Sequence, residues 1–326
     1  MKLHRDRAAQ GTLLARASIP KSKPAIDCDA PRSPQRRQLL GAALLLVAPP
    51  LVRASGHEAR AATARSALKR IEHDCRGRLG VAMLSCRGMA RLEYRSSERF
   101  PLCSTWKLLA VTAILARVDA GQDQLDRRIR FTRNQLVEYS PITSRHVDTG
   151  MTLAALCRAT LSFSDNSTGN FLLRILGGPS ALTRWMRSIG DPSTRLDRFE
   201  TALNEATPGD ARDTTTPSAM ADDLRRILLG DVLHADSRQQ LLHWMGESTT
   251  GTQLLRAGFP ASWIVRDKSG AGRHGSRNDV AIVLPPDRQP LLVAAYLTET
   301  EVPMQERDTA IAGVARTIRD WMLAGA

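Results

Sequence analysis

The sequence has 326 residues, of which 42% are hydrophobic and 24% are charged, with 22 glycines and 17 prolines. This composition is typical of a globular protein and excludes the collagen-like, disordered and disulfide-scaffold classes. The net charge of +13 suggests nucleic-acid binding, but residues 1–54 alone contribute +7 of it. Because no basic stripe interleaved with aromatic residues follows them, we expect no nucleic-acid partner.

The N-terminal segment contains one long apolar run, residues 38–52, which two prolines interrupt. The run is shorter than the ~20 residues that span a bilayer, and Arg36-Arg37 precede it. A plausible cleavage site follows at Ala54. These features predict an export signal over residues 1–54 that resembles a twin-arginine leader, with a general secretory signal as the alternative. We therefore expect a periplasmic or secreted protein that meets the export machinery and keeps no stable membrane anchor.

Helix and strand patterns occupy both ends of the remaining chain. Ala59 to His73 predicts a helix, and apolar residues at three- and four-residue spacing predict a closing helix over Arg307 to Leu323. Short apolar runs predict five strands, at Leu79 to Leu84, Ala90 to Tyr94, Ser262 to Asp267, Asp279 to Leu284 and Leu291 to Leu297. The last two strands must be antiparallel, because the connection 285–290 is too short for a parallel crossover.

Residues 103–245 read as almost wholly helical, with apolar stretches at Leu108 to Leu115 and Ala219 to Leu229. The fold class is therefore α/β, or α+β, with an inserted all-α domain. The predicted domains are a discontinuous α/β domain, 55–102 with 246–326, and an all-α domain, 103–245. The cleft between two such domains is the expected place for a site.

Cysteine and histidine spacing indicates no metal centre. The seven histidines are scattered, and the four cysteines beyond the leader form no Cys-x-x-Cys motif. We therefore expect neither a metal nor another cofactor. Cys75 and Cys86 flank a predicted strand, whose extended length would hold them too far apart for a disulfide.

A Ser-x-x-Lys motif at Ser104 to Lys107 is the first candidate for catalysis. Three residues along a helix bring an ammonium group back over a serine hydroxyl. The motif also occurs at Ser18 and at Ser66, so it is weak by itself. Ser104 differs because it begins an apolar helix, where backbone N–H groups and the helix dipole stabilise negative charge.

Two further motifs occur once each. Ser164-Asp165-Asn166 would also suit a helix N-cap, and Lys268-Ser269-Gly270 ends a predicted strand. Together with Ser104 to Lys107, in this order and on a helix, a loop and a strand, they form the signature of serine β-lactamases and penicillin-binding proteins.

From about Ala59 to its C-terminus the chain resembles a class A serine β-lactamase. Residues 195–205 and 208–217 are similar to the omega loop of that family nearly residue for residue. The resemblance implies a five-stranded antiparallel sheet flanked by helices and joined to a helical domain. It also implies small-molecule β-lactam substrates and a monomer.

The resemblance further implies hydrolysis in two steps, acylation of Ser104 and attack by water on the ester. The acylation base would be Lys107, or Glu200 acting through a water, and Ser164 would relay a proton to the lactam nitrogen. The N–H groups of Ser104 and Ala271 would form the oxyanion hole. Glu200 and Asn204 would hold the deacylating water. Substrate-binding positions by the same resemblance are Tyr139, Asn166, Asn204, Lys268, Ser269, Gly270 and Arg277.

The family pattern also predicts pairs and departures. Arg198 would pair with Asp213, and Arg277 with Asp308. Thr201 stands where many members have a proline after a cis peptide. Family disulfides are absent from the matching positions, which here are Val111 with Cys157 and Cys103 with Gly272. We therefore predict no disulfide, which fits export in folded form from a reducing cytoplasm.

Two alternatives share the three motifs: a penicillin-binding D-alanyl-D-alanine peptidase, and a non-hydrolytic β-lactam sensor that stays acylated. Neither has a competent deacylation pair. The presence of Glu200 with Asn204 therefore argues against both.

Overall fold

A five-stranded antiparallel sheet forms the centre of the fold. The computed structural model describes residues 26, 51–87 and 90–324. The strands follow the order β2-β1-β9-β8-β7, and every neighbouring pair is antiparallel. They are β1 (Arg78–Ser85), β2 (Arg91–Tyr94), β7 (Ile264–Ala271), β8 (Arg277–Leu284) and β9 (Leu291–Thr298). The predicted α/β fold class and its sheet are confirmed.

Two strand boundaries differ from the prediction. Strand β7 begins at Ile264 and continues to Ala271, so Lys268-Ser269-Gly270 lies within the strand rather than after it. Strand β8 begins at Arg277, where it pairs with Ala271. The reason is the β7–β8 ladder, which extends the regular pairing past the apolar stretches on which the sequence pattern depends.

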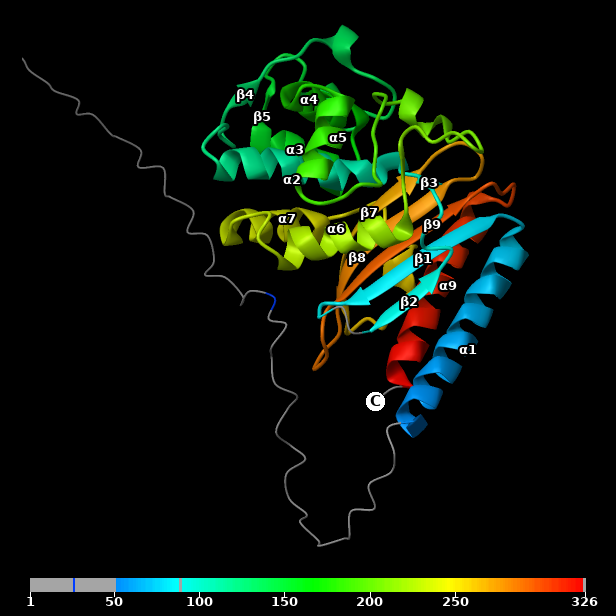
Figure 1. Ribbon diagram of the computed structural model, residues 1–326. Coiled ribbons are helices and arrows are strands. Elements are labelled where there is room, and N and C mark those ends of the chain that lie inside the picture. The colour runs from blue at the N-terminus through cyan, green and yellow to red at the C-terminus, as the bar shows by residue number, and fades with distance from the viewer. Residues whose placement is uncertain (1–25, 27–50, 88–89, 325–326) are drawn as a thin grey trace, which may run out of the picture.

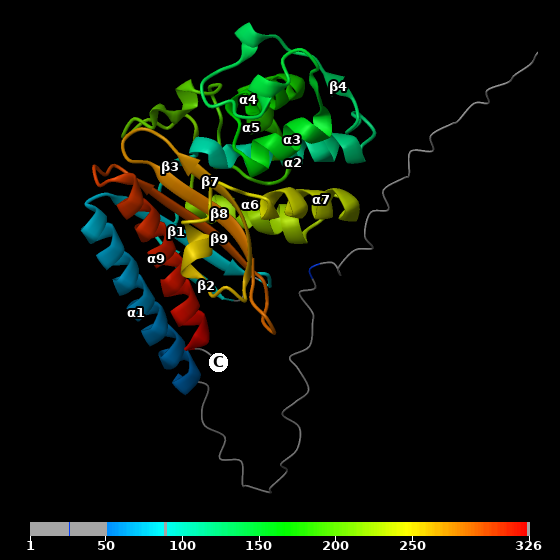
Figure 2. The ribbon, with the colours of Figure 1, turned by 180° about the vertical axis from the view of Figure 1, so that it is seen from behind.

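Three helices cover one face of the sheet: α1 (Leu51–Cys75), α8 (Leu255–Gly258) and α9 (Met304–Leu323). Figure 2 shows α1 and α9 side by side against the strands, with the last helix continuous to its end. Val81 and Val293 pack there with Leu68 and Ile311 in one hydrophobic core. Helix α1 begins earlier than the predicted helix and overlaps the last residues of the predicted leader; the rest of that leader, apart from Ile26, lies outside the described residues.

A second core lies on the opposite face and joins the sheet to the remaining helices (Figure 1). Those helices are α2 (Trp106–Asp119), α3 (Leu153–Ser162), α4 (Asn166–Leu176), α5 (Pro179–Ser188), α6 (Pro217–Leu229) and α7 (Ala235–Gly246). Helix α6 contacts strands β1, β8 and β9 directly. Leu84 and Tyr296 of the sheet share the core with Leu109 of α2 and Leu224 of α6. The division of the chain into domains at 103 and 245 stays a prediction.

The prediction that residues 103–245 are almost wholly helical is wrong in two segments. Residues 120–152 and 189–216 contain only short 3₁₀ turns and paired fragments of two residues. In the first segment β4 (Arg128–Ile129) pairs with β5 (Met151–Thr152), and in the second β6 (Thr214–Thr215) pairs with β3 (Phe100–Pro101), which lies before both segments. Both segments contain helix breakers, such as Gly150 at φ 65° and the Pro208-Gly209 pair.

Within the part of the chain that the structure describes, none of the helices combines the length and apolar character that crossing a bilayer requires.

Candidate active site

A cavity of about 230 Å³ opens where the sheet edge meets the helices on its second face. Its walls come from the 3₁₀ turn that leads into α2, from the two loops that precede α3 and α4, from the first residue of α4, from the omega loop (residues 195–217) and from β7 and β8. The lining residues are Ser104, Tyr139, Ser164, Asn166, Asn204, Thr250, Ser269, Gly270, Ala271 and Arg277. All of them except Thr250 are site residues predicted from the sequence. The structure therefore brings distant motifs to one cavity.

Ser104 and Lys107 meet as the helical spacing requires. Ser104 lies in a 3₁₀ turn, Cys103–Thr105, that leads directly into α2. The Lys107 side chain is fully buried, and its Nζ lies 3.1 Å from Ser104 Oγ. Lys107 Nζ also donates to Asn166 Oδ1 at 2.6 Å and to the main-chain oxygen of Ser164 at 2.8 Å. One ammonium group thus connects the first two motifs.

Glu200 completes this buried network from the omega loop. Its Oε1 lies 3.1 Å from Lys107 Nζ and accepts a hydrogen bond from Trp106 Nε1 at 3.2 Å. Its Oε2 accepts a hydrogen bond from Asn204 Nδ2 at 2.5 Å. Burial lowers the pKa of Lys107, while the nearby Glu200 carboxylate acts in the opposite direction. A lowered pKa increases the fraction of Lys107 that is neutral, and only the neutral amine can accept the proton of the neighbouring Ser104 hydroxyl.

Asn170 of α4 holds the backbone of Glu200 in place. Asn170 Nδ2 donates to the main-chain oxygen of Glu200 at 3.0 Å, and the main-chain N–H of Glu200 donates to Asn170 Oδ1 at 2.9 Å. The Asn170 side chain is almost completely buried. The peptide bond between Glu200 and Thr201 is cis, although Thr201 replaces the proline of many family members.

An ion pair closes the base of the omega loop. Arg198 Nε lies 2.6 Å from Asp213 Oδ2, which confirms the predicted pair. Asp213 Oδ1 also accepts the main-chain N–H groups of Asp197 at 2.7 Å and Arg198 at 3.0 Å. Because the Asp213 carboxylate is buried and accepts several donors, this contact is worth more than an exposed surface pair.

Ser164 lies between the two buried lysines. Its Oγ accepts a hydrogen bond from Lys268 Nζ at 3.0 Å and from Lys107 Nζ at 3.4 Å. Burial, together with the charge of Lys107, lowers the pKa of Lys268 to about 7. The middle residue of this motif has a structural role, because Asp165 caps α4 by accepting the Thr168 N–H at 3.0 Å. The helix-cap interpretation therefore holds for Asp165, while its two neighbours face the cavity.

Strand β7 passes close to Ser104 at Gly270, where a side chain would be crowded. A Cβ atom at Gly270 would lie 3.1 Å from the main-chain nitrogen of Ser104. This approach brings the next residue, Ala271, to the cavity wall beside Ser104. A Cβ atom at Gly272 would lie 2.7 Å from Cys103 Sγ, so the two positions of one family disulfide are adjacent here. No disulfide joins cysteines within residues 51–87 and 90–324, and the Cys103 thiol is fully buried.

Hydroxyl and guanidinium groups gather at the other end of the cavity. Ser269 Oγ donates to Thr250 Oγ1 at 2.7 Å. Arg277 Nε lies 2.6 Å from Asp308 Oδ1, which confirms the predicted pair. Tyr139 stands at the rim with 54% of its surface exposed. This end of the cavity offers the donors that a carboxylate requires.

Three residues at the site were not predicted: Trp106, Asn170 and Thr250. Trp106 lies inside the Ser-x-x-Lys motif, and Asn170 follows Asn166 by four residues, so that both lie on one side of α4. That spacing could have indicated Asn170. No local pattern distinguishes Thr250, which reaches Ser269 only through the fold.

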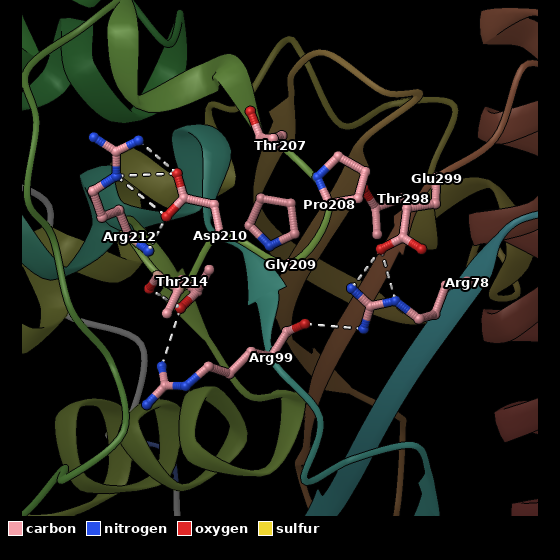
Figure 3. Close-up of a pocket in the computed structure, with 13 residues that line it drawn as sticks. Arg78, Arg99, Thr207, Pro208, Gly209, Asp210, Arg212, Thr214, Thr298 and Glu299 are labelled. Carbon is pink, nitrogen blue, oxygen red and sulfur yellow. Dashed lines mark hydrogen bonds and ion pairs between the residues drawn. The ribbon is translucent and has the colours of Figure 1, made fainter.

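A second cavity, of about 110 Å³, lies on the other side of the omega loop (Figure 3). Four of its charged residues are already paired, Arg212 with Asp210 at 2.7 Å and Arg78 with Glu299 at 2.8 Å, and the fifth, Arg99, donates to the Thr214 hydroxyl at 3.0 Å. None of the predicted site residues lines it. Among the residues that the structure covers, no group of three or more His, Cys, Asp or Glu side chains could hold a metal ion.

Comparisons with known proteins agree with this geometry. The model of the Beta-lactamase enzyme family matches residues 63–322. The Beta-lactamase OXY-2 of Klebsiella oxytoca is 42% identical over 279 residues, which cover 85% of this chain and 96% of that protein. The solved structure of an ancestral (GNCA) class A β-lactamase superposes with a TM-score of 0.78 at 53% identity, covering 79% of this chain and 99% of that one.

A second solved structure, the putative class A β-lactamase PenP from Rhodopseudomonas palustris, gives a TM-score of 0.78 at 47% identity and covers 79% of this chain and 99% of its own. Both the family model and these relatives span most of the chain, including every motif at the cavity. The chain therefore belongs to the class A β-lactamases.

Proposed function

We propose that this protein hydrolyses β-lactam antibiotics through a covalent acyl ester on Ser104, and that Glu200 activates the water that removes the acyl group. The observation that carries this proposal is the buried contact of Glu200 with both Lys107 and Asn204 behind Ser104. A carboxylate held there can accept a proton from a water bound beside it.

In the first step, Ser104 Oγ attacks the lactam carbonyl and forms the ester. The proton of Ser104 leaves either to Lys107 directly, across 3.1 Å, or to Glu200 through a water. The N–H groups of Ser104 and Ala271 stabilise the oxyanion of the tetrahedral intermediate. The C–N bond of the lactam then breaks, and Ser164 passes a proton to the departing nitrogen.

Ser164 suits this relay because Lys107 and Lys268 both reach its hydroxyl. A proton given to the lactam nitrogen by Ser164 can be replaced from either lysine. The relay therefore connects the group that deprotonates Ser104 with the group that protonates the leaving nitrogen.

The substrate is held by two sets of groups. Lys268, Ser269 and Arg277 bind its carboxylate, with Gly270 providing the close backbone approach. Asn166 binds the side-chain amide, and Tyr139 borders the mouth of the cavity. The reaction needs no metal or other cofactor, because each proton transfer has a side chain in position.

In the second step, a water held by Glu200 and Asn204 attacks the ester and frees Ser104. This pair is what distinguishes a β-lactamase from a penicillin-binding peptidase or from a sensor that remains acylated. The protein acts as a monomer, and the leader over residues 1–54 directs it by the twin-arginine route to the periplasm or the medium. Mass measurement of the mature protein from that fraction tests the cleavage near Ala54.

Mass spectrometry of the intact protein after mixing with benzylpenicillin tests the mechanism. We expect the wild type to turn over without accumulating adduct, and Glu200→Ala to trap an acyl group on Ser104. Glu205→Gln is the control in the same loop, because Glu205 is exposed and pairs with Arg198, and it should retain turnover within about threefold. A wild type that itself stays acylated would refute the assigned role of Glu200.

A further inference from the structure

Two buried aspartates face each other at the base of the omega loop. Asp191 follows α5 and precedes the loop, whereas Asp223 lies on α6, which follows the loop. Both residues have 0% of their surface exposed. The loop that carries Glu200 therefore leaves and rejoins the fold at these two carboxyl groups.

Asp191 holds the chain that enters the loop. Its Oδ1 accepts the main-chain N–H of Ser193 at 2.7 Å and that of Thr194 at 3.1 Å. The Thr194 hydroxyl in turn lies 2.6 Å from the Thr215 hydroxyl, on the chain that leaves the loop. Asp191 thus contributes to closing the loop at its base.

Asp223 brings a carboxyl group whose second oxygen has no other partner. Asp223 Oδ1 accepts a hydrogen bond from Arg226 on the same helix at 2.8 Å. Asp223 Oδ2 is fully buried and accepts no hydrogen bond from the described residues, but the carboxyl group lies within hydrogen-bonding reach of Asp191. Two carboxylates have no proton to share, so this contact is favourable only when one of them is protonated.

The charges around the pair do not balance two carboxylates. Arg226 is the only guanidinium that the structure shows bonded to the Asp223 side chain. Arg187 of α5 donates to the main-chain oxygens at residues 191 and 194, at 2.5 and 2.7 Å, and not to either carboxyl group. Arg99 likewise donates to the main-chain oxygen at residue 193. It also donates to the Thr214 hydroxyl (Figure 3).

From the sheet, the buried phenol of Tyr296 on β9 is influenced by the charges of both aspartates, and it is neutral at pH 7 because burial raises its pKa. Burial, together with the charge of Asp191, raises the pKa of Asp223 well above its usual range. Burial also opposes the ionisation of Asp191, but the hydrogen bonds from Thr194 and Asp223 outweigh it and lower the pKa of Asp191. These opposite shifts favour Asp223 as the residue that holds the proton.

We propose that Asp223 is a positioning residue that carries a proton at neutral pH and donates it to Asp191, so that an acid pair joins α6 to the start of the omega loop. Loss of the proton would place two buried carboxylates in contact and weaken the attachment of α6 to the start of the omega loop. Because Glu200 lies in that loop, the expected effect on deacylation rests on the function proposed above, whereas the protonation of Asp223 does not.

Equilibrium unfolding in urea as a function of pH tests the protonation without any substrate. Asp223→Asn keeps the shape and an N–H donor but cannot ionise. In the wild type, folding takes up a proton between the usual pKa of an aspartate and the raised pKa of Asp223, so stability falls as pH rises through this window. The ratio of the wild-type to the Asp223→Asn unfolding constant should then increase by about tenfold per pH unit.

Asp222→Asn is the matched control, because Asp222 is the preceding residue, lies partly exposed and pairs with Arg91 at the surface. The ratio of the wild-type to the Asp222→Asn unfolding constant should not change with pH in that window. A pH-independent ratio for Asp223→Asn would show that Asp223 is ionised in the folded protein and would overturn the proposal. Infrared spectra provide a second reading, since the wild type at pH 7 should show a carboxylic-acid carbonyl band that Asp223→Asn lacks.

Deacylation of the benzylpenicillin adduct at pH 7 tests the positioning role. We expect Asp223→Asn to deacylate within about threefold of the wild type and Asp223→Val, which has no donor, to be slower by about tenfold or more. Wild-type deacylation in Asp223→Val would overturn the positioning role. Should Asp223→Val not fold, the titration of Asp223→Asn still decides the proposal. Failure of the Glu200 mechanism would appear separately: Glu200→Ala would trap no acyl adduct, while the ratio of the wild-type to the Asp223→Asn unfolding constant would still increase with pH.

Discussion

Replacement of Asn170 by alanine should uncouple acylation of Ser104 from its deacylation. Asn170 makes two hydrogen bonds to the backbone of Glu200, at 2.9 and 3.0 Å, from an almost fully buried position. Alanine removes both bonds and leaves the N–H and C=O groups of Glu200 without these partners. Each of the two unpaired buried groups costs about 1–3 kcal/mol, so we expect a loss of about 3 kcal/mol, in the lower part of the resulting range of about 2–6 kcal/mol.

The loss of stability and the loss of activity can be measured independently. At an unfolding entropy of about 2.1 cal/mol/K per residue, about 3 kcal/mol corresponds to a melting temperature roughly 4–6 °C lower for a chain of this size. If the whole penalty acts on the arrangement of Glu200, deacylation slows by about a hundredfold, since 1.4 kcal/mol is about tenfold in rate. Rapid-quench mass spectrometry of the Ser104 adduct measures formation and loss of the ester separately.

Thr112→Val is the control for a buried hydrogen bond outside the site. Thr112 is fully buried in α2 and donates to the main-chain oxygen of Leu108 at 2.8 Å. This variant should lose about 1 kcal/mol of stability and deacylate normally. If Asn170→Ala loses the expected stability but deacylates within about threefold of the wild type, then Asn170 does not position Glu200 and the reasoning fails.

Three further predictions concern charged groups at the site. Because the pKa of Lys268 is lowered to about 7, its positive charge is present below that pH and lost above it. In a pH–rate profile, kcat/KM for a penicillin should therefore fall above about pH 7, and Lys268→Arg should move this fall upward by more than about one pH unit. If the fall does not move, it belongs to the titration of another group. Asp213→Asn breaks the buried pair with Arg198 and should cost about 3 kcal/mol in urea unfolding together with slower deacylation; a variant as stable as the wild type would contradict the weight given to this pair. In steady-state assays, Arg277→Ala should raise KM about tenfold for a penicillin and much less for its methyl ester, with kcat nearly unchanged. Asp308→Asn is the comparison, because Asp308 pairs with Arg277. Equal effects of Arg277→Ala on the acid and on the ester would exclude recognition of the substrate carboxylate by Arg277.

The three motifs could be found in the sequence because each depends on local geometry. Ser104 and Lys107 are one helical turn apart, and this spacing puts them on one side of the helix, where their polar atoms lie 3.1 Å apart. The strands follow from short apolar runs, and the short connection 285–290 already requires an antiparallel pair. The contents of the omega loop came from resemblance to a family, and the pairs of Arg198 with Asp213 and of Arg277 with Asp308 follow that pattern.

Prediction failed where short-range rules compete with one another. Helix-forming residues are common in 120–152 and 189–216, but turns and side-chain hydrogen bonds to the backbone take the place of helical bonds there. Asp165 illustrates the same competition, since its carboxylate satisfies the N–H groups of Ile142 and Thr143 as well as capping α4.

The sequence by itself determined which residues are candidates for the chemistry, and tertiary structure decided which of them contact one another. Periodicity and motif spacing depend on the sterics of the local backbone, which is the same in every fold. By contrast, three contacts join segments that only packing brings together. They are the contact of Glu200 with Lys107, the hydrogen bonds of Asn170 to the backbone of Glu200, and the pairing of Asp191 with Asp223. Burial at those contacts removes water, which makes an unpaired charge or donor costly and gives each partner its protonation state.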